Sequence, residues 1–180
     1  KNFKWDNLFN YGEDNELDFT KLAGTVGIFG KNYSGKSSVV DSLLYTIYNN
    51  TSKNIRKNYN IINEHKDQGS GVVEIEVGNK TYTISRESNK YVKKLKGVVT
   101  NEAKTDVEFS CADNVLKKKY NFNSTERHGT DRNIKKIFGS LEDFLLTSMS
   151  SQLGSMQFIN EGSTRRKEIL AKFLDLEFFE

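Results

Sequence analysis

The stretch "GIFGKNYSGKSSVVDSLLYTIY", residues 27–48, decides the fold of this chain. It begins with apolar residues, continues through glycines and a lysine, and ends with apolar residues at helical spacing. The segment "GKNYSGKS", residues 30–37, fits the pattern G-x-x-x-x-G-K-[ST] at every fixed position. This pattern indicates a phosphate-binding loop where it lies between a buried strand and a helix. We interpret the stretch as such a strand, loop and helix.

Each fixed position of the loop has a chemical reason. Gly30 and Gly35 allow unusual backbone dihedral angles and keep side chains away from an anion. Successive backbone N–H groups and the start of the next helix converge on a β-phosphate. Lys36 can reach the β- and γ-phosphates, and the Ser37 hydroxyl can ligate Mg²⁺. The sequence therefore predicts a nucleotide site that uses ATP and Mg²⁺.

The segments around the loop predict a mixed α/β fold. Residues 3–19 are predicted to form two short strands joined by a turn at 12–15, and "GTVGIFG", residues 24–30, a fully buried central strand. Apolar residues within 37–50 recur at helical spacing, and the pair Asn49-Asn50 is a plausible stop for that helix.

An antiparallel meander is predicted over about residues 70–111. "VVEIEV" and "KTYTIS" form a hairpin around Gly78-Asn79, and two further strands turn near Gly97 and Asn101. Helices are expected from about residue 113 to 162, one of them starting after Ser140 with a capping-box pattern. A last amphipathic helix covers 163–180, with Ser163 or Thr164 available to cap its first turn.

Length and composition fit one folded domain that can contact nucleic acid. The 180 residues include 36% hydrophobic and 12% aromatic residues, and the net charge is +3. The single cysteine, Cys111, excludes an internal disulfide and is predicted to be a small semi-buried strand residue. No run approaches the ~20 apolar residues of a membrane span. We expect a cytoplasmic location, or the host cytoplasm or nucleoid for a phage protein, and further residues before Lys1.

The interior of the loop resembles a particular ATPase family. "GKNYSGKSSVVDSLLY" is similar to the G-x-N-x-S-G-K-S-S-x-x-D-A-[IL] form of SMC-type ATPases, especially the branch of SbcC-like DNA-repair nuclease subunits. The resemblance continues through "FKWDNLFNYGEDNELDF", "NIINE", "VVEIEVGNKTYTISRES" and "FLLTSMSSQLGSMQFINEGSTRRKEILAKFLDLEFFE". It implies that residues 1–180 are the N-terminal lobe of an ATPase head, with a coiled coil starting in 163–180.

The same resemblance implies roles for individual residues. The loop residues around the nucleotide are Gly30, Asn32, Tyr33, Ser34, Gly35, Lys36, Ser37 and Ser38. Gln152 is the implied Gln-loop residue, which contacts Mg²⁺ and the γ-phosphate region, and Gln157 competes for this role. Ile62 and Asn63 fall near a loop that approaches the nucleoside. Many relatives carry an arginine where this chain has Phe9, so Phe9 is a core residue here or Asn10 offers a weaker polar contact.

The elements that complete hydrolysis are missing from the sequence. It has no apolar strand that ends in Asp-Asp or Asp-Glu to hold Mg²⁺, and no S-G-G signature segment. In the resembled family these elements belong to a second half beyond the coiled coil. We therefore expect the chain to bind ATP but not to hydrolyse it alone. The implied partners are the C-terminal lobe, a second head in a homodimer, a metal-dependent nuclease subunit and double-stranded DNA.

Other interpretations remain open. The family also includes SMC-like DNA-organising and phage-defence ATPases without a nuclease partner. A P-loop kinase is disfavoured, because a kinase continues with parallel βα units instead of a meander. The clusters Lys93, Lys94 and Lys96, Lys117–Lys119, and Arg165–Lys167 are solvated surface or contact DNA. Arg86 is predicted to be a surface residue or to form a structural ion pair, rather than to act in catalysis.

Overall fold

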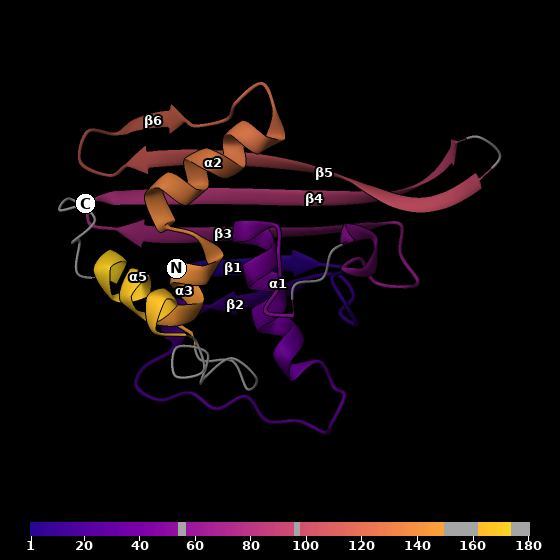
Figure 1. Cartoon of the computed structure of the whole chain (residues 1–180), viewed down its shortest axis with the longest axis horizontal. Coiled ribbons are helices and arrows are strands. Elements are labelled where there is room, and N and C mark those ends of the chain that lie inside the picture. Colours follow the sequence, from indigo (N-terminus) through magenta and orange to yellow (C-terminus); the bar gives the residue numbers. More distant parts are fainter. Residues whose placement is uncertain (54–56, 96–97, 150–161, 174–180) are drawn as a thin grey trace. The chain divides into compact units, whose positions relative to one another are not determined.

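A computed structural model describes residues 1–53, 57–95, 98–149 and 162–173 (Figure 1). The chain divides into two compact units, residues 1–141 and 142–180. Among the described residues, the first unit contains a six-stranded sheet with two α-helices, and the second contains two further helices.

The strands of the first unit are β1 (Asn2–Asp6), β2 (Asn15–Asp18), β3 (Gln68–Val77), β4 (Lys80–Leu95), β5 (Val98–Asp113) and β6 (Lys118–Asn121). Its helices are α1 (Lys36–Tyr48), α2 (Arg127–Phe138) and the 3₁₀ turns η1 (Phe19–Lys21) and η2 (Asn58–Asn60). The remaining helices are α3 (Leu141–Thr147), which starts at the boundary between the units, and α5 (Ser163–Phe173).

The sheet is antiparallel throughout, in the order β2-β1-β3-β4-β5-β6. The strands β1 and β2, the hairpin at Gly78-Asn79 and the end of α1 at Asn49 follow the sequence prediction. β3 pairs with β4 only as far as Gln68↔Asn89, so the remainder of β4 pairs with β5 alone and forms a two-stranded ribbon (Figure 1).

Two predictions about the second half of the sheet are wrong. Asn101 does not lie at a turn; it pairs with Val92 inside the ribbon, because β4 and β5 are single long strands. The region after residue 113 does not start with helix, since β6 pairs with Ser110–Asp113 before α2 begins at Arg127. β6 carries lysines and little apolar alternation, as edge strands often do, and this composition hides it from pattern analysis.

The predicted buried strand over residues 24–30 is also wrong. This segment has no strand conformation and is exposed, with Phe29 93% and Ile28 55% accessible. It belongs to the long connection between η1 and α1 (Figure 1). A strand needs a hydrogen-bonded neighbour, and none of the described strands lies beside this segment. The apolar composition alone does not supply one.

The hydrophobic core lies between the sheet and the helices α1 and α2. Side chains alternate along the strands, so that one face of the sheet is buried and the other is more exposed. Phe3 stacks on Trp5 with their ring centroids 4.7 Å apart. Cys111 lies in β5 and is buried, more fully than its semi-buried prediction. The core residues that α1 and the sheet share include Phe3, Leu44, Tyr45, Val73, Ile84 and Phe109.

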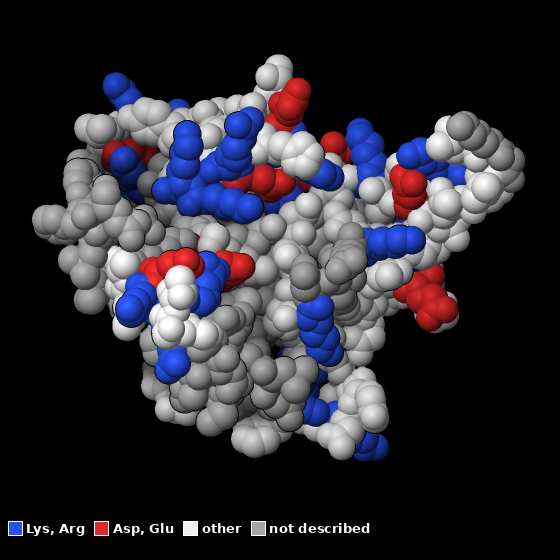
Figure 2. Space-filling model, viewed as in Figure 1, with Lys and Arg blue, Asp and Glu red and all other residues white. Residues whose placement is uncertain are grey.

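Helix α2 covers β5 with its apolar side. Ile134 is buried, and the Phe138 ring meets that of Tyr82 edge-on with their centroids 5.4 Å apart. Its other side is basic, and Figure 2 shows Lys and Arg side chains gathered over this helix. Arg132, Lys135 and Lys136 are its exposed cations.

Helix α1 approaches the sheet closely at one glycine. A Cβ atom placed on Gly71 of β3 would overlap Oγ1 of Thr46. The Thr46 hydroxyl is itself fixed, because it donates a hydrogen bond of 2.8 Å to the carbonyl of Ser42. Only glycine therefore fits at position 71.

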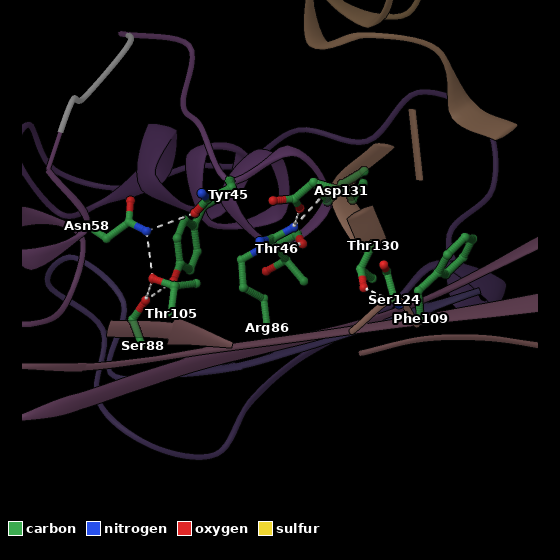
Figure 3. A network of polar contacts seen from close by, with 12 residues as sticks. Tyr45, Thr46, Asn58, Arg86, Ser88, Thr105, Phe109, Ser124, Thr130 and Asp131 are labelled. Carbon is green, nitrogen blue, oxygen red and sulfur yellow. Dashed lines mark hydrogen bonds and ion pairs between the residues drawn. The ribbon is translucent and has the colours of Figure 1, made fainter. Parts of the chain in front are cut away.

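A buried arginine joins α1, β4 and α2. Arg86 of β4 is fully buried; its Nε donates to the carbonyl of Thr46 at 3.0 Å, and its Nη2 to that of Ile47 at 3.3 Å. Nη2 also pairs with Oδ1 of Asp131 in α2 at 2.6 Å (Figure 3). The last carbonyls of a helix lack partners within it, so this guanidinium satisfies the end of α1. Of the two roles that the sequence predicted for Arg86, the structural ion pair is the one it has.

A chain of buried hydroxyl and amide groups fixes the same helix to η2. The Tyr45 hydroxyl lies 2.5 Å from Oγ of Ser88, which bonds in turn to Oγ1 of Thr105 (Figure 3). The amide of Asn58 donates to Thr105 at 2.7 Å and to the Asn49 side chain at 2.8 Å. Burial raises the pKa of Tyr45 above its ordinary value, so its hydroxyl stays neutral.

Replacing Arg86 is expected to destabilise the fold strongly. Arg86→Ala leaves Asp131 and two carbonyls of α1 without their partner, and breaking a buried pair in this way costs about 3–5 kcal/mol. Urea unfolding followed by circular dichroism measures the loss. Arg132→Ala, an exposed arginine on α2, is the control and should change stability little. A loss below ~1 kcal/mol for Arg86→Ala would contradict the role assigned to it.

Gly71→Ala should destabilise through overpacking. The added methyl group collides with the Thr46 side chain, and overpacking of this kind costs about 1–3 kcal/mol. The double variant Gly71→Ala/Thr46→Ala, which removes the colliding oxygen, should recover part of the loss. Gly12→Ala is the matched control, because open space surrounds that position. Thermal unfolding of these variants, the parent and the single variant Thr46→Ala tests the contact, and purely additive losses in the double variant would argue against it.

Candidate nucleotide-binding site

The segment Gly30–Ser38, here called the glycine loop, leads directly into α1. Gly35 is the residue before the helix and has a left-handed backbone with φ of 90°. No side chain caps this end of α1. The N–H groups of the first turn of a helix lack partners within it and carry a partial positive charge. The start of α1 is therefore suited to an anion.

The Lys36 ammonium lies against the same loop. Its Nζ donates to the carbonyls of Gly30 at 2.8 Å and Lys31 at 2.6 Å. A Cβ atom on Gly30 would lie 2.7 Å from Oγ of Ser34, so a larger residue there would displace the exposed Ser34 side chain. The loop therefore holds a cation beside the start of α1, which is the arrangement that a polyphosphate requires.

The connection between β1 and β2 packs against the glycine loop. The Tyr11 hydroxyl donates to the carbonyl of Gly35 at 3.0 Å, and burial raises the pKa of Tyr11, so the hydroxyl keeps its proton. The amide of Asn10 would lie 2.8 Å from a Cβ atom on Gly35. The structure thus brings Asn10 to the loop, where its contact with a nucleotide stays a prediction. The sequence did not single out the contact made by Tyr11.

Ile62 and Asn63 hold this connection in place. Ile62 forms a β-bridge with Leu8 and is buried, and Asn63 donates from its side chain to the carbonyl of Tyr11 at 2.9 Å. Phe9, at the position of the missing arginine, is half-buried with φ of 53°. These contacts give Ile62 and Asn63 a structural role next to the loop. Their approach to a nucleoside stays a prediction.

The remaining predicted residues lie in the exposed part of the loop or outside the described residues. Asn32, Tyr33, Ser34 and Ser37 are exposed, and Tyr33 has a positive φ of 64°. Gln152 and Gln157 lie outside the described residues. In the part of the chain that the structure describes, no three His, Cys, Asp or Glu side chains gather as a metal site. Oxygen ligands for Mg²⁺ at this loop would come from Ser37, nucleotide phosphates and water.

The basic clusters of the sequence are spread over the surface. Lys93 pairs with Glu102 at 3.5 Å, and Arg165 pairs with Glu142 and Glu168, each at 3.0 Å. Lys117 is exposed at the turn between β5 and β6, Lys118 and Lys119 are exposed at the start of β6, and Lys96 lies outside the described residues. These pairs occupy some of the cations, and DNA contact by the others stays a prediction.

An open antiparallel sheet, a glycine loop and a helix that starts directly after it define the N-terminal lobe of a P-loop ATPase. Comparison with protein families agrees. Residues 3–178 match the model of a family described as an AAA domain, and because the match covers nearly the whole chain, the chain belongs to this family.

Individual relatives place it in the SMC-type, SbcC-like class. It is 29% identical to the uncharacterized protein R555 of Acanthamoeba polyphaga mimivirus over 98% of this chain. It is 34% identical to the DNA double-strand break repair Rad50 ATPase of Sulfolobus acidocaldarius over 37% of the chain, and 23% identical to the SbcC component of the SbcCD nuclease of Bacillus subtilis over 94%. The matches cover 13%, 8% and 15% of these relatives, respectively.

Among the described residues, none forms a helix with the length and apolar character needed to cross a bilayer.

Tyr11→Phe should loosen the glycine loop with little effect on the fold. The change removes the hydrogen bond to the Gly35 carbonyl, worth about 1 kcal/mol, and keeps the ring that packs edge-on against Trp5. We expect a weakening of ATP affinity of roughly fivefold, measured by calorimetric titration. Tyr120→Phe in the edge strand β6 is the control and should bind ATP like the parent. Equal affinity of all three proteins would exclude a positioning role for Tyr11.

Proposed function

We propose that this chain is the ATP-binding N-terminal lobe of an SMC-type ATPase head that acts on DNA. The observation that carries the proposal is the glycine loop, in which an uncapped helix start and the Lys36 ammonium lie together. The relatives named as a DNA repair ATPase and as part of a nuclease support a role in DNA processing.

The loop residues have distinct roles in this proposal. Backbone N–H groups from Asn32 to Ser38 surround the phosphates, and Lys36 neutralises the β- and γ-phosphates. The Ser37 hydroxyl would ligate Mg²⁺, and Gln152 would contact the metal and the γ-phosphate region. When bound, Mg²⁺ would help to neutralise the phosphate charge.

The exposed segment before the loop supports the proposed need for a second lobe. Val26, Ile28 and Phe29 are 50%, 55% and 93% exposed, although their apolar run has the composition of a buried strand. A C-terminal lobe that adds a neighbouring strand would bury these side chains and pair their backbone. The same lobe would bring the acidic strand end and the signature segment that the sequence lacks.

The larger assembly is a further part of the proposal. Two heads would enclose two ATP molecules, so that ATP binding favours the engaged pair and hydrolysis releases it. Double-stranded DNA and a metal-dependent nuclease subunit are the proposed partners. The name of the Bacillus subtilis relative describes that protein as a subunit of a nuclease. The alternative is an SMC-like DNA-organising or phage-defence ATPase without a nuclease partner.

The proposal is tested by separating binding from hydrolysis. The 180-residue chain should bind ATP with Mg²⁺ but release no phosphate above background. Lys36→Ala should weaken ATP binding by at least tenfold, because a hydrogen bond to a charged group contributes about 1.5–3 kcal/mol. Lys135→Ala, an exposed lysine of α2, is the control and should bind like the parent.

Two outcomes would contradict this proposal. If the parent chain fails to bind ATP, the assignment of the glycine loop is wrong. If the chain hydrolyses ATP robustly without a partner, and Lys36→Ala abolishes that turnover, the proposed need for a second lobe is wrong. Addition of the C-terminal lobe should create turnover that depends on Lys36.

A further inference from the structure

Two adjoining hollows lie at the start of α2, away from the glycine loop. Their volumes are 580 and 650 Å³, and Ala103 and Arg127 line both. The first also reaches Asn49 and Asn50 at the end of α1. Since α1 has 13 residues, its two ends are roughly 20 Å apart. These hollows are therefore separate from the proposed ATP site.

Arg127 lines both hollows, and its Nε has no hydrogen-bond partner in the part of the chain that the structure describes. This Nε is buried, and no carboxylate among the described residues pairs with it. Asp131, one turn further along α2, pairs with Arg86 instead. A partly buried guanidinium whose Nε lacks a partner is costly, because its charge loses water and gains no compensating contact there. An external anion would supply that contact.

The charges around Arg127 favour an anion. Of the two acidic residues that line the hollows, Glu102 accepts from Tyr91 at 2.6 Å and Asp106 pairs with Lys104 at 3.3 Å. Their charges are thus partly balanced. The lining also contributes Lys57, on the side of η2, and His128, next to Arg127.

The lining also limits what kind of anion would fit. Asparagine side chains line the first hollow from the end of α1, from η2 and from β5, and an amide can donate and accept hydrogen bonds. The amide of Asn58 already donates to Asn49 and Thr105. The two hollows follow β5 from Thr100 to Asp106, at the base of the projecting β4–β5 ribbon (Figure 1). An elongated polar groove lined by cations is better suited to a sugar-phosphate backbone than to a small carboxylate ligand.

We propose that Arg127 binds a phosphate group of a nucleic-acid backbone that lies along these hollows. The planar guanidinium can donate two parallel hydrogen bonds to one phosphate, which a lysine cannot do. Naming nucleic acid as the source of the phosphate rests on the proposed function in DNA processing. The phosphate chemistry itself rests on the position of Arg127.

The test compares Arg127→Gln with Arg132→Gln in the 180-residue chain. Both substitutions remove one positive charge from α2, but Arg132 is exposed and lines neither hollow. Fluorescence anisotropy measures binding to a labelled single-stranded oligonucleotide and to the matching duplex. We expect Arg127→Gln to weaken binding to at least one probe by about tenfold or more, and Arg132→Gln by less than about twofold. The slope of log affinity against log salt should fall by about 0.9 in Arg127→Gln.

Thermal unfolding distinguishes a ligand site from a structural role. If Arg127 serves a ligand, Arg127→Gln keeps or raises the melting temperature, because it removes an unpaired charge. A lower melting temperature together with equal loss of oligonucleotide binding in both variants would overturn the proposal. Failure of the parent chain to bind either probe would also overturn it.

Measuring ATP binding by the same proteins distinguishes a failure of this inference from a failure of the proposed function. Arg127→Gln should bind ATP like the parent, and ATP or inorganic phosphate should displace the oligonucleotide only weakly. Strong displacement by inorganic phosphate would assign the site to free phosphate and overturn the nucleic-acid assignment. A parent chain that binds ATP but no oligonucleotide refutes only this inference. A chain that binds oligonucleotide through Arg127 but not ATP refutes only the proposed function.

Discussion

The buried guanidinium of Arg86 is the contact on which the arrangement of the first unit depends. It reaches two carbonyls at the end of α1 and the carboxylate of Asp131 in α2 from a central strand of the sheet. Its burial removes water from the ion pair, so the charge must be balanced by these partners alone. One side chain thus fixes the position of two helices relative to the strand that carries it.

The Arg86 contact matters for the glycine loop because the two lie at opposite ends of the same helix, α1. The end of α1 is held by Arg86, by the hydroxyl network from Tyr45 and by the close contact of Thr46 with Gly71. The start of the same helix presents the N–H groups expected to meet phosphate. A helix anchored at its end places its start reproducibly, and the Tyr11 hydrogen bond then positions Gly35 from the other side.

Features encoded by neighbouring residues were predictable from the sequence, and features that depend on distant partners were not. The glycine loop, the end of α1 at Asn49 and the hairpin at Gly78-Asn79 have local chemical signals. Residues 24–30 are apolar enough for a buried strand, but the sequence does not say whether a neighbouring strand exists in the same chain.

In the candidate nucleotide site, too, some features could be predicted from neighbouring residues and others depend on distant partners. The loop residues follow from the motif, and Asn10 follows from the resemblance, whereas no pattern marks Tyr11 as a partner of Gly35. Asp131 lies one turn after Arg127 on α2 but pairs with Arg86, a residue more than 40 positions away in the sequence. Side-chain pairing over such separations is decided by tertiary packing.

The order of the strands also has a consequence for how the chain folds. Adjacent strands in the sheet are sequence neighbours except β1 and β3, where Phe3 pairs with Val73. That one pairing closes a long loop that contains the glycine loop and α1, and closing it has the largest entropic cost in the sheet. The segment that contacts Gly35 is continuous with β1. Assembly of the nucleotide site therefore depends on formation of the β1–β3 pairing, which is expected to be the slowest strand pairing in this sheet.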